Sequence, residues 1–181
     1  IAPELSSIDE IERRLKEIGL RKLSSPAWAS GLLNLNENEE DILMSLNGKW
    51  RNCLRKGWKL GVEAGLSQDL NKDIQVVNNF YKNLQKEKDF VGLSDPLLKA
   101  MSQKSHRFWH FNIFIAKSKE RGKSKDIIGI LVSVNHGNKS IYLIGSTTEE
   151  GRKLQANYVL LWEAILEAKK FQGEKVAQQI K

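Results

Sequence analysis

Apolar residues recur every three or four positions along much of the chain, which is the spacing of one face of an α-helix. The pattern predicts helices over residues 8–18, 36–61, 70–86, 95–105 and 153–171. Asn36 and Glu39 have the spacing of a capping box at the start of the second helix, and Gly61 is its expected end. Gly19 and Gly173 are the expected stops of the first and last helices.

Between these helices the pattern changes to that of strands. Residues 108–116 alternate aromatic and β-branched side chains, whereas residues 127–134 are apolar on both faces, as in a central strand. Residues 141–144 form the next expected strand, and short links make the three an antiparallel meander. Further extended segments are expected at 20–23, 32–35 and 62–66. The predicted class is α/β (α+β), a mostly antiparallel sheet flanked by helices, in a single domain spanning 1–181.

Composition and charge limit the kinds of ligand and partner that the chain is expected to bind. The net charge is +7 and the pI is about 9.4, which favours RNA, phosphorylated small molecules or an acidic membrane surface, although solubility alone explains such a charge equally well. Cys53 is the one cysteine and the three histidines are scattered, so we expect no disulfide and no metal site. No apolar run is long enough for a transmembrane segment, and no signal peptide is evident. We expect a cytoplasmic protein, with peripheral membrane association as one option.

Residues 49–61 carry the most informative charges. Arg51, Arg55 and Lys59 follow each other at four-residue steps and so share one face of the predicted helix. Like charges at this spacing repel each other unless an anion or a carboxylate lies between them. We therefore predict a docking row for phosphate or carboxylate groups. The alternative is a solvated basic face near a helix C-terminus, where the helix dipole favours cations.

The junction between the last strand and the last helix, residues 145–158, is a second candidate, because ligands often bind where a strand leads into a helix. It contains no Walker or G-x-G-x-x-G motif. It also lacks the R-x-x-G-x-G/A phosphate loop of coenzyme A-dependent N-acetyltransferases, and Glu149 and Glu150 would repel a pyrophosphate. An ordinary polar loop is the alternative.

Two segments together resemble a known family. KWRNCLRKGWKLGVE, residues 49–63, is similar to the FemABX signature of a helix with K-W/Y-R-x-x-x-R-K that ends at a glycine before a strand. GSTTEEGRKLQANYVLLWEAILEAKKFQG, residues 145–173, is similar to that family's Gly-x-Ser, Ala-Asn, Leu-x-Trp-Glu-Ala-Ile, Ala-Lys and Gly pattern. The resemblance covers roughly residues 28–173 and preserves the order and spacing of both motifs.

The resemblance implies a GNAT-like (N-acetyltransferase-like) lobe. Well-known FemABX members, in which two such lobes pack together, move an amino acid from aminoacyl-tRNA to the peptide of a peptidoglycan precursor. By analogy tRNA and a peptidoglycan precursor are the expected partners, aminoacyl-tRNA or acyl-CoA is the donor, and no bound cofactor or DNA is expected. The implied substrate-binding residues are Arg51, Arg55, Lys56, Lys59, Ser146, Asn157 and Tyr158. No catalytic residue or general base is assigned.

The chain departs from the family pattern after Gly173, where members continue with an Asp-Leu-Gly-Gly strand and this sequence reads GEKVAQQIK. Since the sequence also begins at Ile1, we expect a fragment or one lobe of a longer protein. Two other functions stay open: a coenzyme A-dependent N-acyltransferase, and a non-catalytic module that binds RNA or a protein partner on the same fold.

Overall fold

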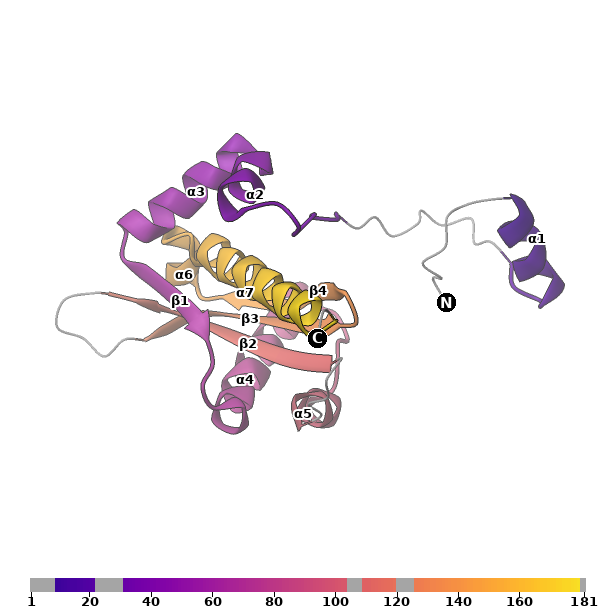
Figure 1. Ribbon diagram of the computed structural model, residues 1–181. Helices are drawn as coiled ribbons and strands as arrows, with labels where there is room; N and C mark the ends of the chain where they lie inside the picture. The colour runs from indigo at the N-terminus through magenta and orange to yellow at the C-terminus, as the bar shows by residue number, and fades with distance from the viewer. Residues whose placement is uncertain (1–8, 22–30, 104–108, 120–125, 180–181) are drawn as a thin grey trace. The chain divides into compact units, whose positions relative to one another are not determined.

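The computed structural model describes residues 9–21, 31–103, 109–119 and 126–179 (Figure 1). Its contacts divide the chain into two compact units, residues 1–33 and residues 34–181. Parts of four expected elements fall outside the described ranges, namely residue 8, residues 22–23, residues 104–105 and residue 108. The sheet and the helices that pack on it belong wholly to the second unit.

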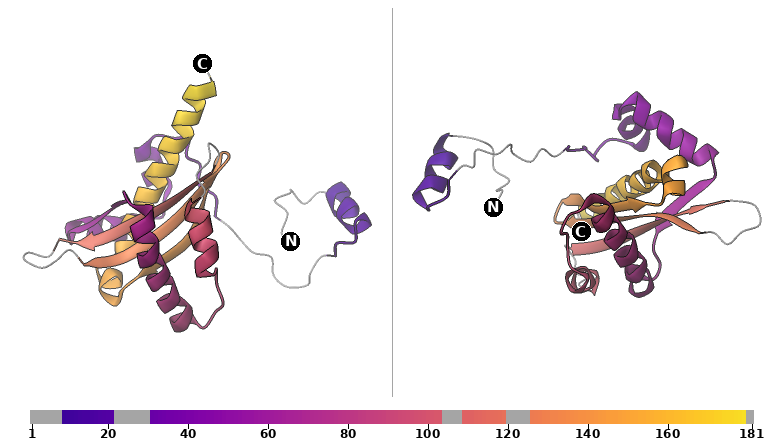
Figure 2. Two further views of the ribbon diagram at one scale, coloured as in Figure 1. Left: turned by 90° about the horizontal axis from the view of Figure 1, so that it is seen from below. Right: turned by 180° about the vertical axis from the view of Figure 1, so that it is seen from behind.

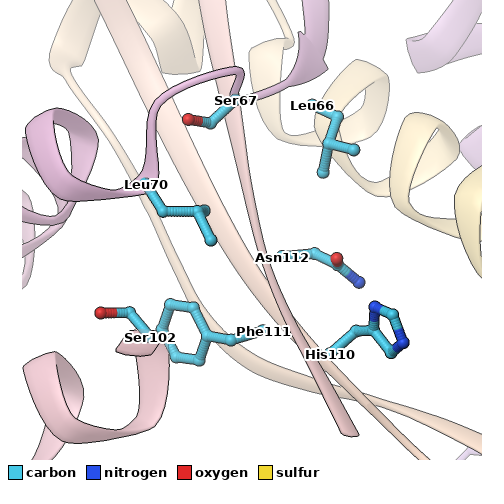
Figure 3. A pocket seen from close by; sticks show the side chains of 7 residues that line it. All are labelled: Leu66, Ser67, Leu70, Ser102, His110, Phe111 and Asn112. Atoms are coloured by element: carbon cyan, nitrogen blue, oxygen red, sulfur yellow. The ribbon is translucent and has the colours of Figure 1, made fainter. Parts of the chain in front are cut away.

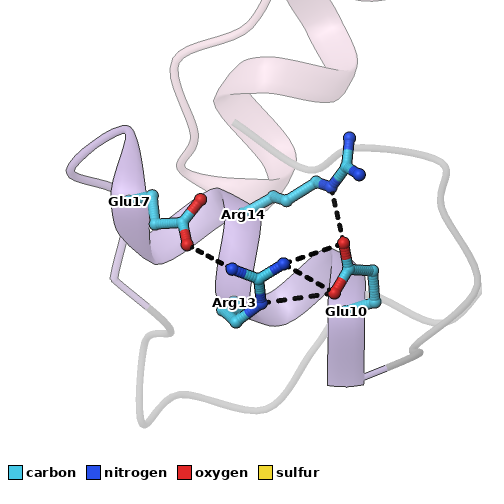
Figure 4. A network of polar contacts seen from close by, with 4 residues as sticks. All are labelled: Glu10, Arg13, Arg14 and Glu17. Carbon is cyan, nitrogen blue, oxygen red and sulfur yellow. Dashed lines mark hydrogen bonds and ion pairs between the residues drawn. The ribbon is translucent and has the colours of Figure 1, made fainter.

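The first unit contains helix α1 (Asp9–Glu17). Arg13 forms ion pairs with Glu10 at 2.8 Å and with Glu17 at 2.7 Å, and Arg14 contacts Glu10 at 2.8 Å (Figure 4). Hydrogen bonds from Arg13 and then from Arg14 lower the pKa of Glu10. The helix ends at Gly19, whose φ of +85° is the left-handed conformation that glycine adopts readily, so the predicted stop is confirmed.

The second unit is built on a four-stranded sheet in the order β1 (Val62–Leu66), β2 (Trp109–Ser118), β3 (Ile127–His136) and β4 (Lys139–Thr147). Every neighbouring pair is antiparallel. The predicted meander is therefore confirmed, and the expected extended segment at residues 62–66 joins it as an edge strand. Residues 32–35 form no strand.

Helices cover both faces of the sheet (Figures 1 and 2). α7 (Ala156–Gln179) and α3 (Gly48–Lys59) lie on one face, while α4 (Leu70–Lys88) and α5 (Asp95–Gln103) lie on the other. Each layer has its own core: Phe114 and Leu131 point toward α7, whereas Ile113 and Val132 point toward α4 and α5. β3 is buried along nearly its whole length, which confirms it as the central strand.

The helix expected over residues 36–61 is in fact two helices, α2 (Glu39–Ser45) and α3. Leu46 is extended, with ψ of 150°, and breaks the helix. The caps are Asn38, which accepts from the N–H of Asp41, and Asn47, which accepts from the N–H of Lys49. The capping-box interpretation of Asn36 was wrong, because a better-placed asparagine starts the helix two residues later.

The last helix was also predicted wrongly at both ends. A short helix α6 (Glu149–Lys153) precedes α7, and Gln155 separates them in the left-handed region with φ of +64°. At the other end α7 continues through Gly173. A glycine costs a helix interior only about 1 kcal/mol, so residues that favour helix on both sides can carry the helix past it.

Candidate functional site

The two segments that carry the family resemblance pack directly against each other. A Cβ on Gly57 of α3 would lie 2.7 Å from Cγ2 of Val159 in α7, so the glycine allows the helices to approach closely. About two turns earlier in α3, the ring of Trp50 makes edge-to-face contacts with two rings of α7. The ring centroids lie 5.6 Å apart for Tyr158 and 6.4 Å apart for Trp162. α3 and α7 therefore run past each other with their motif residues facing inward.

Tyr158 is the polar residue at this junction. Its phenol forms a hydrogen bond with Cys53 of α3, and this bond, together with burial and the charge of Cys53, raises the pKa of Tyr158. From the sequence, Tyr158 is among the implied substrate-binding residues, whereas Cys53 has no part in the site. The signal that joins them is that Trp50, Cys53 and Gly57 lie on one side of the helix, at spacings of three and four residues.

Arg51 has a different environment from the other cations of α3. Its Nη1 atom donates hydrogen bonds to the carbonyl oxygens of Met44 at 2.7 Å and of Leu46 at 2.5 Å. These carbonyls lie at the C-terminal end of α2, where helical carbonyls have no partner within the helix. The guanidinium thus links the end of α2 to α3. Arg51, one of the three cations of the predicted docking row, is therefore already engaged in hydrogen bonds within the protein.

Arg55, Lys56 and Lys59 are exposed. Residues are rotated by about 100° each along a helix, so Arg55 and Lys59 lie on the side of α3 opposite the buried Leu54 and Gly57. They form a solvent-facing positive surface, which we call the α3 basic face: Arg55, Lys56 and Lys59. Its role in binding an anion stays a prediction.

Ser146 and Asn157 are not brought together with this face. The Oγ atom of Ser146 donates to the carbonyl oxygen of Phe80 in α4, at 3.4 Å, on the face of the sheet away from α7. Asn157 is exposed, and its position about 100° before Tyr158 turns it away from α3. Of the three predicted residues that lie outside α3, Tyr158 is the one with a contact to α3, through the ring of Trp50.

The end of β4 is held by its own contacts. The Thr148 hydroxyl accepts from the N–H of Gly151 at 3.0 Å and caps α6. Arg152 donates to the carbonyl oxygen of Thr147 at 3.3 Å and lies 3.7 Å from the carboxylate of Glu87 in α4. Earlier in β4, the pairing shifts from Val132–Ile144 to Ser133–Tyr142, which leaves Leu143 as a bulge. Bulges often occur beside functional sites.

Neither a metal centre nor a membrane span is found in the parts of the chain that the structure describes. No three side chains among its His, Cys, Asp and Glu residues gather closely enough to hold a metal ion. Within those same ranges, every helix is too short or too polar to cross a bilayer.

The chain is similar to a known protein in structure, but neither the family models nor the curated proteins match its sequence. No family model matches the chain, and no curated protein is significantly similar to it. The crystal structure of FemX superposes on it with a TM-score of 0.71 and 12% sequence identity, over 90% of this chain. The chain spans 57% of the FemX chain. It therefore has a FemABX-like fold, an α+β, GNAT-like arrangement of an antiparallel sheet between helices.

Proposed function

We propose that this chain is the lobe of a FemABX-type transferase, which moves an aminoacyl or acyl group from an activated donor to an amine. One observation carries the proposal: the two segments that resemble the family in sequence meet at Gly57–Val159 and Trp50–Tyr158 in a fold that FemX shares. Motif residues scattered over the surface would have given no such support.

In this reaction the amine nitrogen of the acceptor attacks the carbonyl carbon of the donor ester. A C–N bond forms, the C–O bond to the donor breaks, and the proton lost by the amine passes to the leaving oxygen. The protein's main contribution is to hold both substrates in place. The α3 basic face would hold the phosphates of aminoacyl-tRNA, and Tyr158 would border the transferred group. A peptide of a peptidoglycan precursor is the proposed acceptor.

The test is a tRNA titration at several salt concentrations, followed by a transfer assay with labelled aminoacyl-tRNA and an amine-bearing peptide. Replacing Arg55, Lys56 and Lys59 by alanine should weaken binding and reduce the salt slope by about 2–3, because each phosphate contact releases counterions. The matched control replaces Lys72, Lys86 and Lys99, which are exposed on α4 and α5.

The outcomes separate the alternative functions. Equal loss in both triple variants would contradict a specific role for the α3 basic face. Binding of tRNA without transfer would favour an RNA-binding module. Thermal stabilisation by acetyl-CoA, without tRNA binding, would favour a coenzyme A-dependent N-acyltransferase.

A further inference from the structure

Trp58 is a large aromatic residue on the surface of α3, next to the α3 basic face. It is 43% exposed, whereas the rings of Trp50 and Trp162 pack against each other between α3 and α7. Arg55 lies three residues before Trp58 and four before Lys59, so Trp58 and Lys59 are both neighbours of Arg55 on the helix surface. A flat apolar ring therefore lies beside two cations that face the solvent.

These two features together define the chemistry of a ligand. The cations favour a negatively charged group, and the guanidinium of an arginine can pair with phosphate oxygens through two N–H groups. The indole ring offers a flat face on which another planar group can stack. A nucleotide carries both a phosphate and a planar base. Proteins that bind single-stranded nucleic acids combine positive charge with stacking aromatic side chains in this way.

An anionic lipid surface would match the charge of this region but not the arrangement of its apolar residues. A helix that lies in a membrane interface presents a continuous apolar face to the lipid. In α3 the apolar face, with Leu54 and Gly57, is buried against α7. Leu60, just past the end of α3, is also exposed, but it lies about 200° around the helix axis from Trp58. One isolated ring fits a single base better than a bilayer.

A small pocket beside β2 offers no comparable site (Figure 3). Its volume is about 150 Å³, and it begins at Leu66, at the opposite end of β1 from α3. No lysine or arginine lines it, and His110 is the one titratable side chain in its wall. A phosphate group would meet no such cation there, so the open surface of α3 is the better site for a nucleotide.

We propose that the α3 basic face binds single-stranded RNA, with the ring of Trp58 stacked on an unpaired base. This inference rests on the proposed function, because the same cations would hold the RNA phosphates. Stacking adds a selectivity that charge alone does not provide. In a duplex each base is already stacked between its neighbours, so only the terminal bases have a free face. The surface should therefore prefer single-stranded RNA to a duplex of equal charge.

The experiment measures the binding of two labelled probes by fluorescence anisotropy at low salt. One probe is an oligoadenylate of about eight nucleotides, and the other has the same sugar–phosphate backbone without bases. The unaltered protein should bind the oligoadenylate about 5- to 100-fold more tightly, which is the stacking contribution of one base. Trp58→Ala should reduce oligoadenylate binding to the level of the abasic probe and leave the salt slope unchanged.

Three further variants serve as controls. Trp58→Phe keeps an aromatic ring and should retain most of the preference for the oligoadenylate. Trp58→Met removes the ring but keeps an apolar side chain, so it still decides if a thermal melt shows that the alanine variant is unfolded. Phe90→Ala is the matched control, because Phe90 is 41% exposed and lies between α4 and α5. It should bind both probes like the unaltered protein.

Equal binding of the two probes by the unaltered protein, or equal effects of Trp58→Ala and Phe90→Ala, would overturn the proposal. The variant with Arg55, Lys56 and Lys59 replaced by alanine tests the proposed function separately, because it should lose both probes. If that variant loses both probes and Trp58→Ala loses neither, the α3 basic face binds phosphate but Trp58 does not stack. Binding to vesicles of anionic lipid, with no preference for probes that carry bases, would overturn the proposal in favour of a membrane surface.

Discussion

The ammonium group of Lys169 in α7 donates hydrogen bonds to the carbonyl oxygens of Leu35 at 3.2 Å and of Glu37 at 2.5 Å. One side chain thereby fastens the segment before α2 to the long helix. Lys169→Met keeps the aliphatic stem but removes both bonds, so we expect a loss of about 1–2 kcal/mol in the free energy of unfolding. Faster amide hydrogen exchange at residues 35–38 should accompany it.

Lys170→Met is the matched control for that change. Lys170 is exposed and lies 3.8 Å from the carboxylate of Glu167, a surface ion pair of little energetic weight. A similar loss of stability in both variants would argue against the fastening role of Lys169.

The close approach of α3 and α7 predicts a strict limit on size at Gly57. Gly57→Ala should destabilise the protein by about 1–3 kcal/mol in chemical denaturation, because the new methyl group would lie only 2.7 Å from Cγ2 of Val159. Adding Val159→Ala should recover part of the loss. Gly48→Ala serves as the control, since its nearest neighbour is the flexible side chain of Arg51 at 3.8 Å.

Arg51 and Arg55 should differ in what they stabilise, although the sequence places them on one row. Arg51→Ala leaves the carbonyls of Met44 and Leu46 without their donor and should lower stability by about 2 kcal/mol. Arg55→Ala should leave the melting temperature unchanged and weaken binding of tRNA. If Arg51→Ala has the melting temperature of the unaltered protein, the hydrogen bonds of Arg51 to the end of α2 do not contribute to stability.

The Cys53–Tyr158 pair predicts a change in the tyrosine titration. Cys53→Ala removes the hydrogen bond that raises the pKa of Tyr158, so this tyrosine should ionise at lower pH in tyrosinate absorbance. A folded-state pKa above the unfolded value stabilises the fold below the unfolded pKa, and the contribution disappears as pH rises through the folded value. The unaltered protein should therefore lose more stability than Cys53→Ala above about pH 10. Tyr142, whose pKa is raised by partial desolvation although 57% of the residue is exposed, should be unaffected.

Glu163 of α7 predicts a pH effect in the acidic range. Burial raises the pKa of its carboxyl group, while the charge of Lys170 opposes the shift. The protonated carboxyl group is thus the form that the fold favours, and this contribution is present below the unfolded pKa and lost as pH rises through the folded one. Glu163→Gln should match the unaltered protein in acid and exceed it in stability at neutral pH. Equal pH profiles of the two proteins would contradict this assignment.

Sequence periodicity predicted the central strand, the meander and α4 because their apolar patterns are long and regular. Periodicity failed where the backbone conformation of a single residue ends a helix. Leu46 ends α2 in an extended conformation. Gln155 separates α6 from α7 with a positive φ, which a glutamine in the sequence does not predict. The candidate site was predictable as two motif segments, but not as a junction. Residue spacing cannot show that Arg51 of α3 faces the end of α2 or that Ser146 of β4 faces α4, since both depend on tertiary packing.

The strand order also has a consequence for how the chain folds. β2, β3 and β4 follow each other along the chain, so pairing each strand with the next closes only a short loop and costs little conformational entropy. β1 reaches Phe114 only after α4 and α5 have been looped out, which is the longest closure in the sheet. We expect the three-strand meander to form early and β1 to dock late, so destabilising substitutions in β1 should speed unfolding more than they slow refolding.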